Sequence, residues 1–161
     1  MNCYLMNRER VVGKILELFV SKKGDSSRTS KEKLTVDENG VWEDKFYGKE
    51  PNRSLLITSL DSYNLAKGKN ISVAHGTLGE NILMDYNPYM LNVGTQIRVG
   101  EVILEISQSC TLCKSLTKID NRLPKLLKND RGVFARVIKS GHIHKSDEVS
   151  ILYFKYDSKE L

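Results

Sequence analysis

Two short segments carry the residues best suited to chemistry. The first, residues 76–82 with the sequence GTLGENI, has two glycines that let the backbone turn tightly and approach a ligand closely. The second, residues 110–113 with the sequence CTLC, holds two thiols. A thiolate is both the nucleophile that accepts sulfane sulfur as a persulfide and a soft metal ligand. We therefore expect one site in which a thiol works beside a glycine-lined loop.

Cys113 is the candidate catalytic and metal-binding thiol, and Cys110 is a second candidate catalytic thiol. Other interpretations of the pair stay open. Free cysteine is often a small buried hydrophobic residue. The C-x-x-C spacing also suits a redox pair, although the βαβ pattern of thioredoxin-like proteins is missing around it. The pair is also half of a zinc site, which His142 and His144 could complete.

Three residues of the first segment, Gly79, Glu80 and Asn81, are candidate cofactor-binding residues. Backbone N–H groups and the amide of Asn81 could surround a polar ligand, while Glu80 orients its neighbours by hydrogen bonds. The alternative is a turn that needs only glycine dihedrals, with Asn81 satisfying buried backbone groups. His75, which precedes the segment, could anchor this loop or belong to the site.

The elements that position these segments are mostly strands. Residues 11–20 favour a strand, with a helix as the alternative, and the polar stretch 21–33 predicts a long loop. Alternation from 97 to 106 around Gly100 and Glu101 predicts a hairpin with a type II′ turn, whose second strand runs into the cysteines. Further strands are expected at 34–36, 54–58, 132–138 and 149–154, and helical turns at 59–67 and 116–127. This pattern indicates a mainly β barrel or sandwich.

Length and composition favour a folded intracellular protein. The 161 residues suffice for one domain, expected to span 1–161. The 25 Lys and Arg residues are interleaved with 20 Asp and Glu, so the net charge of +5 forms no basic stripe of the kind that binds nucleic acid. No apolar run approaches the roughly 20 residues of a membrane span, and residues 1–10 do not match a secretory signal. With three cysteines and no disulfide framework, we expect a cytoplasmic protein that binds neither nucleic acid nor membranes.

Several short motifs occur in a characteristic order. They are GENI at 79–82, the hairpin that leads into a thiol, GVFARV at 132–137, Gly141, and SDEV at 146–149. In this order the chain resembles the MOSC family, the domains found at the C-terminus of molybdenum-cofactor sulfurases and in related stand-alone proteins. The resemblance extends from about Val12 to Ile151 and implies a β-barrel with a few short helices.

The resemblance also implies a function. It implies binding of molybdenum cofactor (molybdopterin) or transfer of sulfur, with Cys113 as the reactive cysteine and with Arg53 and Arg136 either clamping the phosphate or remaining solvated charges. The family often has Arg-x-Pro-Cys where this chain has CTLC, so an arginine that would favour the thiolate is missing. Stand-alone members also permit a thiol-dependent reductase of N-hydroxylated compounds. A third alternative is a non-catalytic module that docks onto a cofactor-biosynthesis enzyme or a molybdoenzyme.

Overall fold

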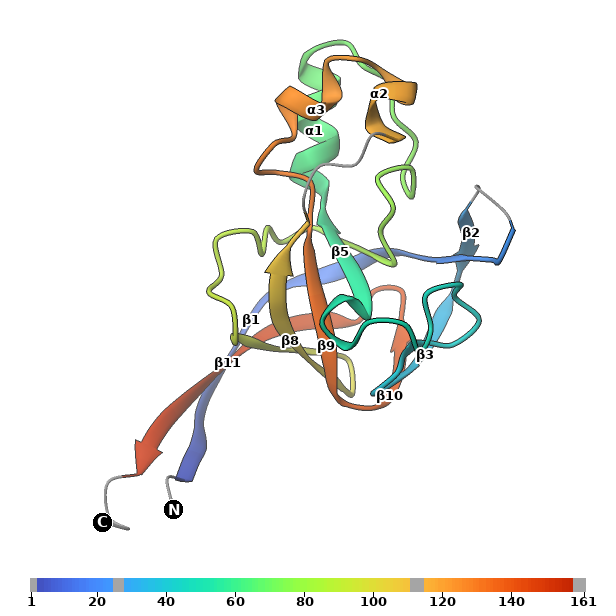
Figure 1. Ribbon diagram of the computed structural model, residues 1–161. Coiled ribbons are helices and arrows are strands. Elements are labelled where there is room, and N and C mark those ends of the chain that lie inside the picture. Colours follow the sequence, from blue (N-terminus) through green and yellow to red (C-terminus); the bar gives the residue numbers. More distant parts are fainter. Residues whose placement is uncertain (1–2, 25–27, 111–114, 158–161) are drawn as a thin grey trace.

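The computed structural model describes residues 3–24, 28–110 and 115–157 (Figure 1). The strands are β1 (Cys3–Ser21), β2 (Arg28–Lys31), β3 (Lys33–Asp37), β4 (Gly40–Val41), β5 (Leu55–Ser59), β6 (Ile82–Met84), β7 (Gln96–Val99), β8 (Val102–Ser109), β9 (Val133–Lys139), β10 (Gly141–His144) and β11 (Glu148–Asp157). The helices are α1 (Leu60–Gly68), α2 (Ser115–Ile119) and α3 (Leu123–Leu126), and a 3₁₀ turn, η1, covers Pro51–Arg53.

Seven of the described strands close into a barrel. Their order around it is β1, β11, β7, β8, β9, β5, β6 and back to β1. Neighbours are antiparallel except β5 and β6, which run parallel with α1 in the segment that connects them. β2 extends the sheet from the end of β1, and β10, β3 and β4 form a small separate sheet. The predicted mainly β barrel with a few short helices is therefore confirmed.

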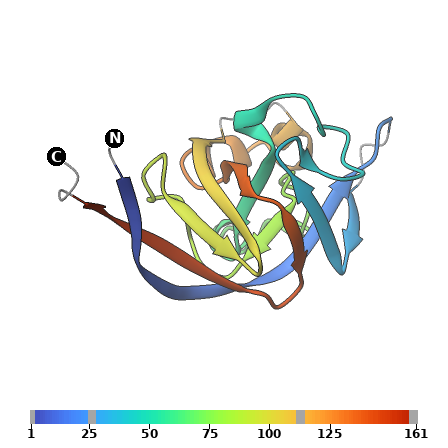
Figure 2. The same cartoon turned by 90° about the horizontal axis from the view of Figure 1, so that it is seen from below.

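β1 is long because it serves three partners in succession. It pairs with β11 along residues 3–14, with β6 along residues 15–18 and with β2 along residues 18–21. Register shifts in these pairings bend the strand around the barrel. Figures 1 and 2 show β1 and β11 continuing past the barrel as a two-stranded ribbon. The helical alternative for residues 11–20 is wrong, and part of the predicted loop at 21–33 is strand β2.

Alternating apolar side chains of the barrel strands fill its interior. Burial alternates along β8 in this way, as a barrel wall requires. The predicted hairpin is confirmed, because Val99 of β7 pairs with Val102 of β8 across the two-residue turn. Gly100 has a φ of 59°, which suits the first turn position of a type II′ connection.

A second apolar cluster lies beside the barrel, where the helices gather (Figure 1). Ser59 caps α1 by accepting a hydrogen bond from the backbone N–H of Asp61 at 3.1 Å. The cluster joins Tyr63 of α1 to Leu78 and to Leu116 of α2. The helices therefore support the segment around Leu78 from outside the barrel. None of the described helices has the length and hydropathy of a membrane span.

Candidate functional site

A pocket of about 900 Å³ opens beside the segment that the sequence singles out. Its lining includes one carboxylate, that of Glu50, and five cationic side chains: Arg28, Lys45, Lys49, Arg53 and Arg131. We call it the cationic pocket. Such a surplus of positive charge raises the local concentration of anions. The pocket is therefore suited to an anionic ligand.

The glycine loop (residues 76–81) forms one wall of the cationic pocket. Gly76 and Gly79 have φ values of 91° and 100°, in the left-handed region that favours glycine. At Gly79, nitrogen atoms of the Arg28 and Arg131 guanidinium groups lie 3.5 and 3.8 Å from the position that a Cβ would take. Two cations thus converge on bare backbone, an arrangement that can hold an anion.

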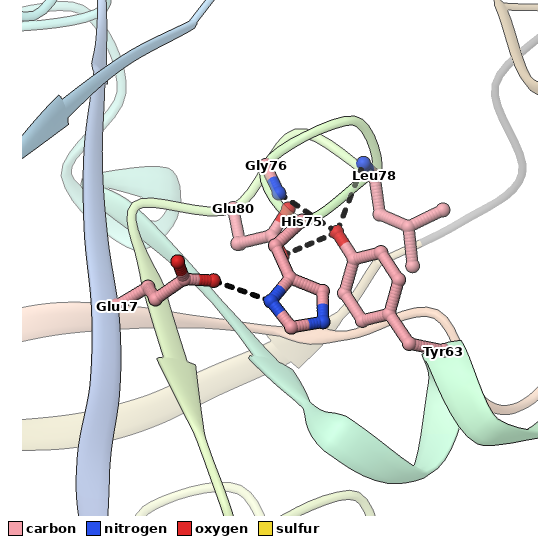
Figure 3. A network of polar contacts seen from close by, with 6 residues as sticks. All are labelled: Glu17, Tyr63, His75, Gly76, Leu78 and Glu80. Atoms are coloured by element: carbon pink, nitrogen blue, oxygen red, sulfur yellow. Dashed lines mark hydrogen bonds and ion pairs between the residues drawn. The ribbon is translucent and has the colours of Figure 1, made fainter. Parts of the chain in front are cut away.

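Tyr63 of α1 holds the glycine loop in place (Figure 3). Its hydroxyl donates to Glu80 Oε2 at 2.5 Å and accepts from the backbone N–H groups of Gly76 at 3.0 Å and Leu78 at 3.4 Å. Burial, followed by the charge of the neighbouring Glu80, raises the pKa of Tyr63, so the phenol keeps its proton. One hydroxyl therefore satisfies three polar groups of the loop.

Glu80 lies beneath the glycine loop and is 0 % exposed. Its Oε1 has no hydrogen-bond partner among the residues that the structure describes. Burial raises the pKa of this carboxyl, opposed first by the hydrogen bond from Tyr63 and more weakly by the charge of Arg28. Burial in turn lowers the pKa of Arg28, which donates to the backbone oxygen of Glu80 at 3.5 Å. Glu80 thus supports the loop without lining the cationic pocket.

His75 stands at the start of the glycine loop with its ring held on two sides (Figure 3). Its Nδ1 contacts the carboxylate of Glu17, which comes from β1. The imidazole meets the ring of Tyr63 edge to face, with 4.7 Å between centroids. His75 also lines the cationic pocket. It therefore anchors the loop and contributes to the pocket wall.

Asn81 connects separate segments through its side-chain amide. Its Oδ1 accepts from the backbone N–H of Leu56 at 3.1 Å, and its Nδ2 donates to the backbone oxygen of Phe19 and to Asp44 Oδ1, both at 3.2 Å. Asp44 also accepts from the backbone N–H of Ser21 at 2.8 Å. The amide satisfies buried protein groups, as the turn interpretation expects, while the residue still lines the cationic pocket.

Several predicted site residues come together here. Cys110, Arg53, Gly79 and Asn81 all line the cationic pocket, although Cys110 lies 29 positions after Asn81 in the sequence. Cys113, another predicted site residue, lies outside the described residues. The structure thus joins the glycine loop to one of the two predicted thiols.

Arg136 lies apart from the cationic pocket. Phe134 and Arg136 share one face of β9, as strand alternation predicts. Phe134 lines the pocket, and the guanidinium of Arg53 lies 4.7 Å from its ring centroid. Arg136, one strand repeat further on, forms an ion pair with Glu105 of β8 at 3.1 Å. In this structure its charge is directed to that carboxylate.

The two histidines that could complete a zinc site lie far from Cys110. The backbone N–H of His142 donates to Glu101, just before β8, at 2.7 Å. Cys110 follows the opposite end of this 8-residue strand. At about 3.3 Å per residue, the two ends of β8 are roughly 26 Å apart. Among the described residues, no three or more His, Cys, Asp and Glu side chains gather closely enough to hold a metal ion. The described part of the chain therefore gives zinc binding through His142 and His144 no support.

Most of the positive charge in the cationic pocket cannot be predicted from the sequence. Arg28, Lys45, Lys49 and Arg131 come from segments far apart in the chain, and none lies in a motif that marks a ligand site. Arg131 offers the one usable signal, since it directly precedes the GVFARV motif. Only the folded barrel shows that these cations face the same volume.

The closed barrel, the glycine loop and the cationic pocket with a cysteine in its wall define a small β-barrel domain with a pocket at its edge. The family model of the MOSC domain matches residues 44–150. The chain therefore belongs to the MOSC family, as the sequence motifs predict.

Solved structures share this fold. The YuaD protein from Bacillus subtilis superposes with a TM-score of 0.77 at 16 % identity, covering 96 % of this chain and 100 % of that one. YiiM from Geobacillus stearothermophilus gives a TM-score of 0.62 at 15 % identity over 91 % of this chain and 75 % of YiiM. YiiM from Escherichia coli gives a TM-score of 0.65 at 18 % identity over 87 % of this chain and 70 % of that YiiM. The comparison with curated protein sequences found no match.

Proposed function

We propose that this chain binds molybdenum cofactor, or a related anionic sulfur-bearing ligand, in the cationic pocket and contacts it through the thiol of Cys113. The observation that carries the proposal is the pocket itself, in which five cationic side chains and the bare backbone of Gly79 line about 900 Å³ with Cys110 in the wall. A volume of this size suits a small organic ligand or cofactor. Membership of the MOSC family supplies the ligand class.

The residues of the pocket fit the phosphate of a pterin cofactor. Guanidinium groups bind phosphate oxygens through paired, charge-assisted hydrogen bonds, and those of Arg28 and Arg131 converge on Gly79. Arg53 adds a third guanidinium. The chain lacks the arginine that the family often places before its cysteine, and these cations would supply the positive potential that favours a thiolate.

Cys113 enters the proposal through its place in the sequence. It stands three positions after Cys110 and two before Ser115, and both of these residues line the cationic pocket. The bound cofactor would supply sulfur or molybdenum chemistry, and the thiol would retain it, with Cys110 as a second thiol. We further propose that the domain works in the cytoplasm, where thiols stay reduced, beside a cofactor-biosynthesis enzyme or a molybdoenzyme.

Retention of the cofactor tests the proposal directly. The full chain is purified from a host that makes molybdenum cofactor, and molybdenum is measured by elemental mass spectrometry together with pterin fluorescence. We expect near-stoichiometric cofactor on the parent protein and at least a tenfold loss in Cys113→Ser, because the thiol that holds the ligand is gone. Intact mass spectrometry would also show one added sulfur atom on Cys113 in a sulfur carrier.

Cys3→Ser is the matched control, because Cys3 is the first residue of β1 and pairs with Asp157 in the ribbon that continues past the barrel. It should retain the cofactor as the parent does. Equal retention by Cys113→Ser and the parent would remove this cysteine from the proposal. A cofactor-free protein that turns over an N-hydroxylated compound would instead support the reductase, and one that only captures a biosynthetic enzyme would support the docking module.

A further inference from the structure

A second hollow, of about 960 Å³, adjoins the cationic pocket. Three aromatic side chains in its lining, Trp42, Phe46 and Tyr47, are 53, 50 and 38 % exposed. We call it the aromatic hollow. A cluster of exposed large apolar side chains often marks a binding surface, whereas single exposed apolar residues are common on any protein. The chemistry of the surrounding residues decides what such a surface can bind.

Asp37 fixes two of these aromatic side chains. Its Oδ2 accepts hydrogen bonds from Trp42 Nε1 at 2.8 Å and from the hydroxyl of Tyr47 at 2.6 Å. The hydrogen bond from Tyr47 is the main cause that lowers the pKa of Asp37, so the carboxylate remains an acceptor. Rings that are already held in position lose less conformational entropy when a planar ligand stacks on them.

Positive charge borders these rings. The carboxylates of the aromatic hollow are already engaged, since Glu43 pairs with Lys31 at 3.2 Å, Glu50 pairs with Arg53 at 3.7 Å, and buried Asp44 accepts backbone N–H groups. Three lysines line the hollow: Lys23, Lys45 and Lys49. Of these, Lys23 and Lys49 form no ion pair with any described residue. Their charge is therefore available to an anionic ligand.

Trp42, which Asp37 fixes, and the nearby Phe46 line the hollow beside these lysines, which suits one ligand chemistry, a planar base joined to a phosphate. We infer that the aromatic hollow binds a nucleoside 5′-phosphate, with the base stacked on Trp42 and Phe46 and the phosphate at Lys49. Stacking on aromatic side chains accepts any base, because every base has a π face. A nucleoside without phosphate should therefore bind more weakly than its nucleotide.

The two cavities are continuous in their lining. Lys45, Phe46, Lys49 and Glu50 line both the aromatic hollow and the cationic pocket. The nucleotide can therefore be a free mononucleotide or one half of a dinucleotide whose other half lies in the cationic pocket. The dinucleotide case rests on the proposed function, since the complete ligand would then be a nucleotide-bearing form of the cofactor. The free mononucleotide case does not depend on the proposed function.

The single tryptophan of the chain provides the readout. The full-length protein is titrated with adenosine, guanosine and cytidine 5′-monophosphates, and the emission of Trp42 is recorded with correction for inner-filter absorption. We expect saturable quenching by the nucleotides. The matching nucleosides should need at least about fivefold higher concentrations, and inorganic phosphate alone should leave the emission unchanged. Calorimetry of the same pairs gives the affinity independently of fluorescence.

Two variants remove the proposed contacts singly. Phe46→Ala removes one stacking partner and Lys49→Ala removes the phosphate contact, and each should weaken nucleotide binding at least about fivefold. The matched controls are Phe154→Ala and Lys139→Ala, exposed residues on β11 and β9 that should bind as the parent does. Circular dichroism checks that all four variants are folded.

A second phosphate distinguishes the two sources of the nucleotide. If the ligand continues into the cationic pocket, a nucleoside 5′-diphosphate should bind more tightly than the monophosphate, and Arg53→Ala should weaken the diphosphate more than the monophosphate. Equal binding of both would indicate a free mononucleotide. Absence of saturable quenching and of calorimetric heat, or equal affinities of Phe46→Ala, Lys49→Ala and the parent, would overturn the nucleotide site. The titration with mononucleotides needs no cofactor, so failure of the cofactor proposal leaves this test intact.

Discussion

Glu80 is a buried acid that shapes the site without entering the cationic pocket. A charged carboxylate with 0 % exposure is costly, because burial removes its hydration. Tyr63 offsets part of this cost with a hydrogen bond at 2.5 Å. The pair is nonetheless useful to the fold, since the same phenol accepts the N–H groups of Gly76 and Leu78. We infer that these buried polar groups fix one conformation of the glycine loop.

The raised pKa of Glu80 predicts a pH-dependent stability. The Glu80 carboxyl keeps its proton above the ordinary pKa of 4.5 in the folded protein but not in the unfolded chain. The contribution of Glu80 to the free energy of unfolding therefore falls as the pH rises from 4.5 through the folded pKa. Glu80→Gln keeps an acceptor for Tyr63 and has no proton to lose. Its melting temperature should therefore rise relative to the parent between about pH 5 and about pH 8. A constant difference across this range would contradict the prediction, and exposed Glu38→Gln serves as the control.

Removing the phenol tests the other half of the pair. Tyr63→Phe leaves the N–H groups of Gly76 and Leu78 and the carboxyl of Glu80 without their shared partner, so we expect a loss of about 1–3 kcal/mol in the free energy of unfolding. Chemical denaturation measures it. Tyr86→Phe is the matched control, because the Tyr86 hydroxyl forms no hydrogen bond with a described residue, and it should cost less than about 0.5 kcal/mol. Equal losses would show that the network contributes nothing specific.

Among the elements, the glycine loop depends most on backbone geometry. Gly76 combines a φ of 91° with the ring of Phe19, which would lie 3.0 Å from an added Cβ. Gly79 has a similar φ but only ordinary contact distances around it. The loop therefore uses glycine for two different reasons, close packing at its start and an exposed backbone at its pocket wall. The sequence predicts a glycine turn but not this division, because Phe19 lies 57 positions away.

Gly76→Ala should consequently destabilise the protein more than an alanine that meets open space. Gly48 is the matched position, since it has a φ of 74° and no atom within 4 Å of an added Cβ. Gly48→Ala pays only the backbone strain, about 1 kcal/mol, whereas Gly76→Ala adds the contact with Phe19 and should cost at least about 2 kcal/mol. Thermal and chemical unfolding compare the two. Equal costs would mean that the Phe19 ring moves aside freely.

The elements also show where sequence patterns suffice. The β7–β8 hairpin follows from alternation and from Gly100, both of them local signals. Strand β2 is missed because its polar residues become a strand only by pairing with β1. The site divides similarly. Arg53 is expected from the family resemblance, while Arg28 and Arg131 reach the cationic pocket through long-range packing that no local pattern encodes.

At the scale of the whole molecule, the paired strands β1 and β11 lie partly in the barrel wall and partly in a two-stranded ribbon beyond it. Inside the barrel wall they lie against further strands, whereas beyond Arg8 and Tyr153 they pair only with each other among the described strands. Leu5, Met6 and Phe154 on this ribbon are 54, 50 and 43 % exposed. A two-stranded ribbon is marginally stable on its own.

Hydrogen exchange should separate these environments within single strands. We expect the amides of residues 5–8 and 154–156 to exchange at least a hundredfold faster than those of residues 15–20, because the latter pair with β6 and then β2 in the barrel wall and are mostly buried. Exchange measured by mass spectrometry on peptic peptides resolves the segments, and residues 97–104 serve as the protected reference. Equal protection along β1 would contradict the prediction and show that something else covers the ribbon.

The pairing of β1 with β11 also constrains how the protein is made. These strands lie at opposite ends of the sequence, and their contact closes the barrel. While β11 is still inside the ribosome, the nascent chain can form its local hairpin but leaves one edge of β1 unpaired. Closure must therefore wait until β11 has left the ribosome, so a holding chaperone can bind β1 for as long as the segment between the two strands is being synthesised.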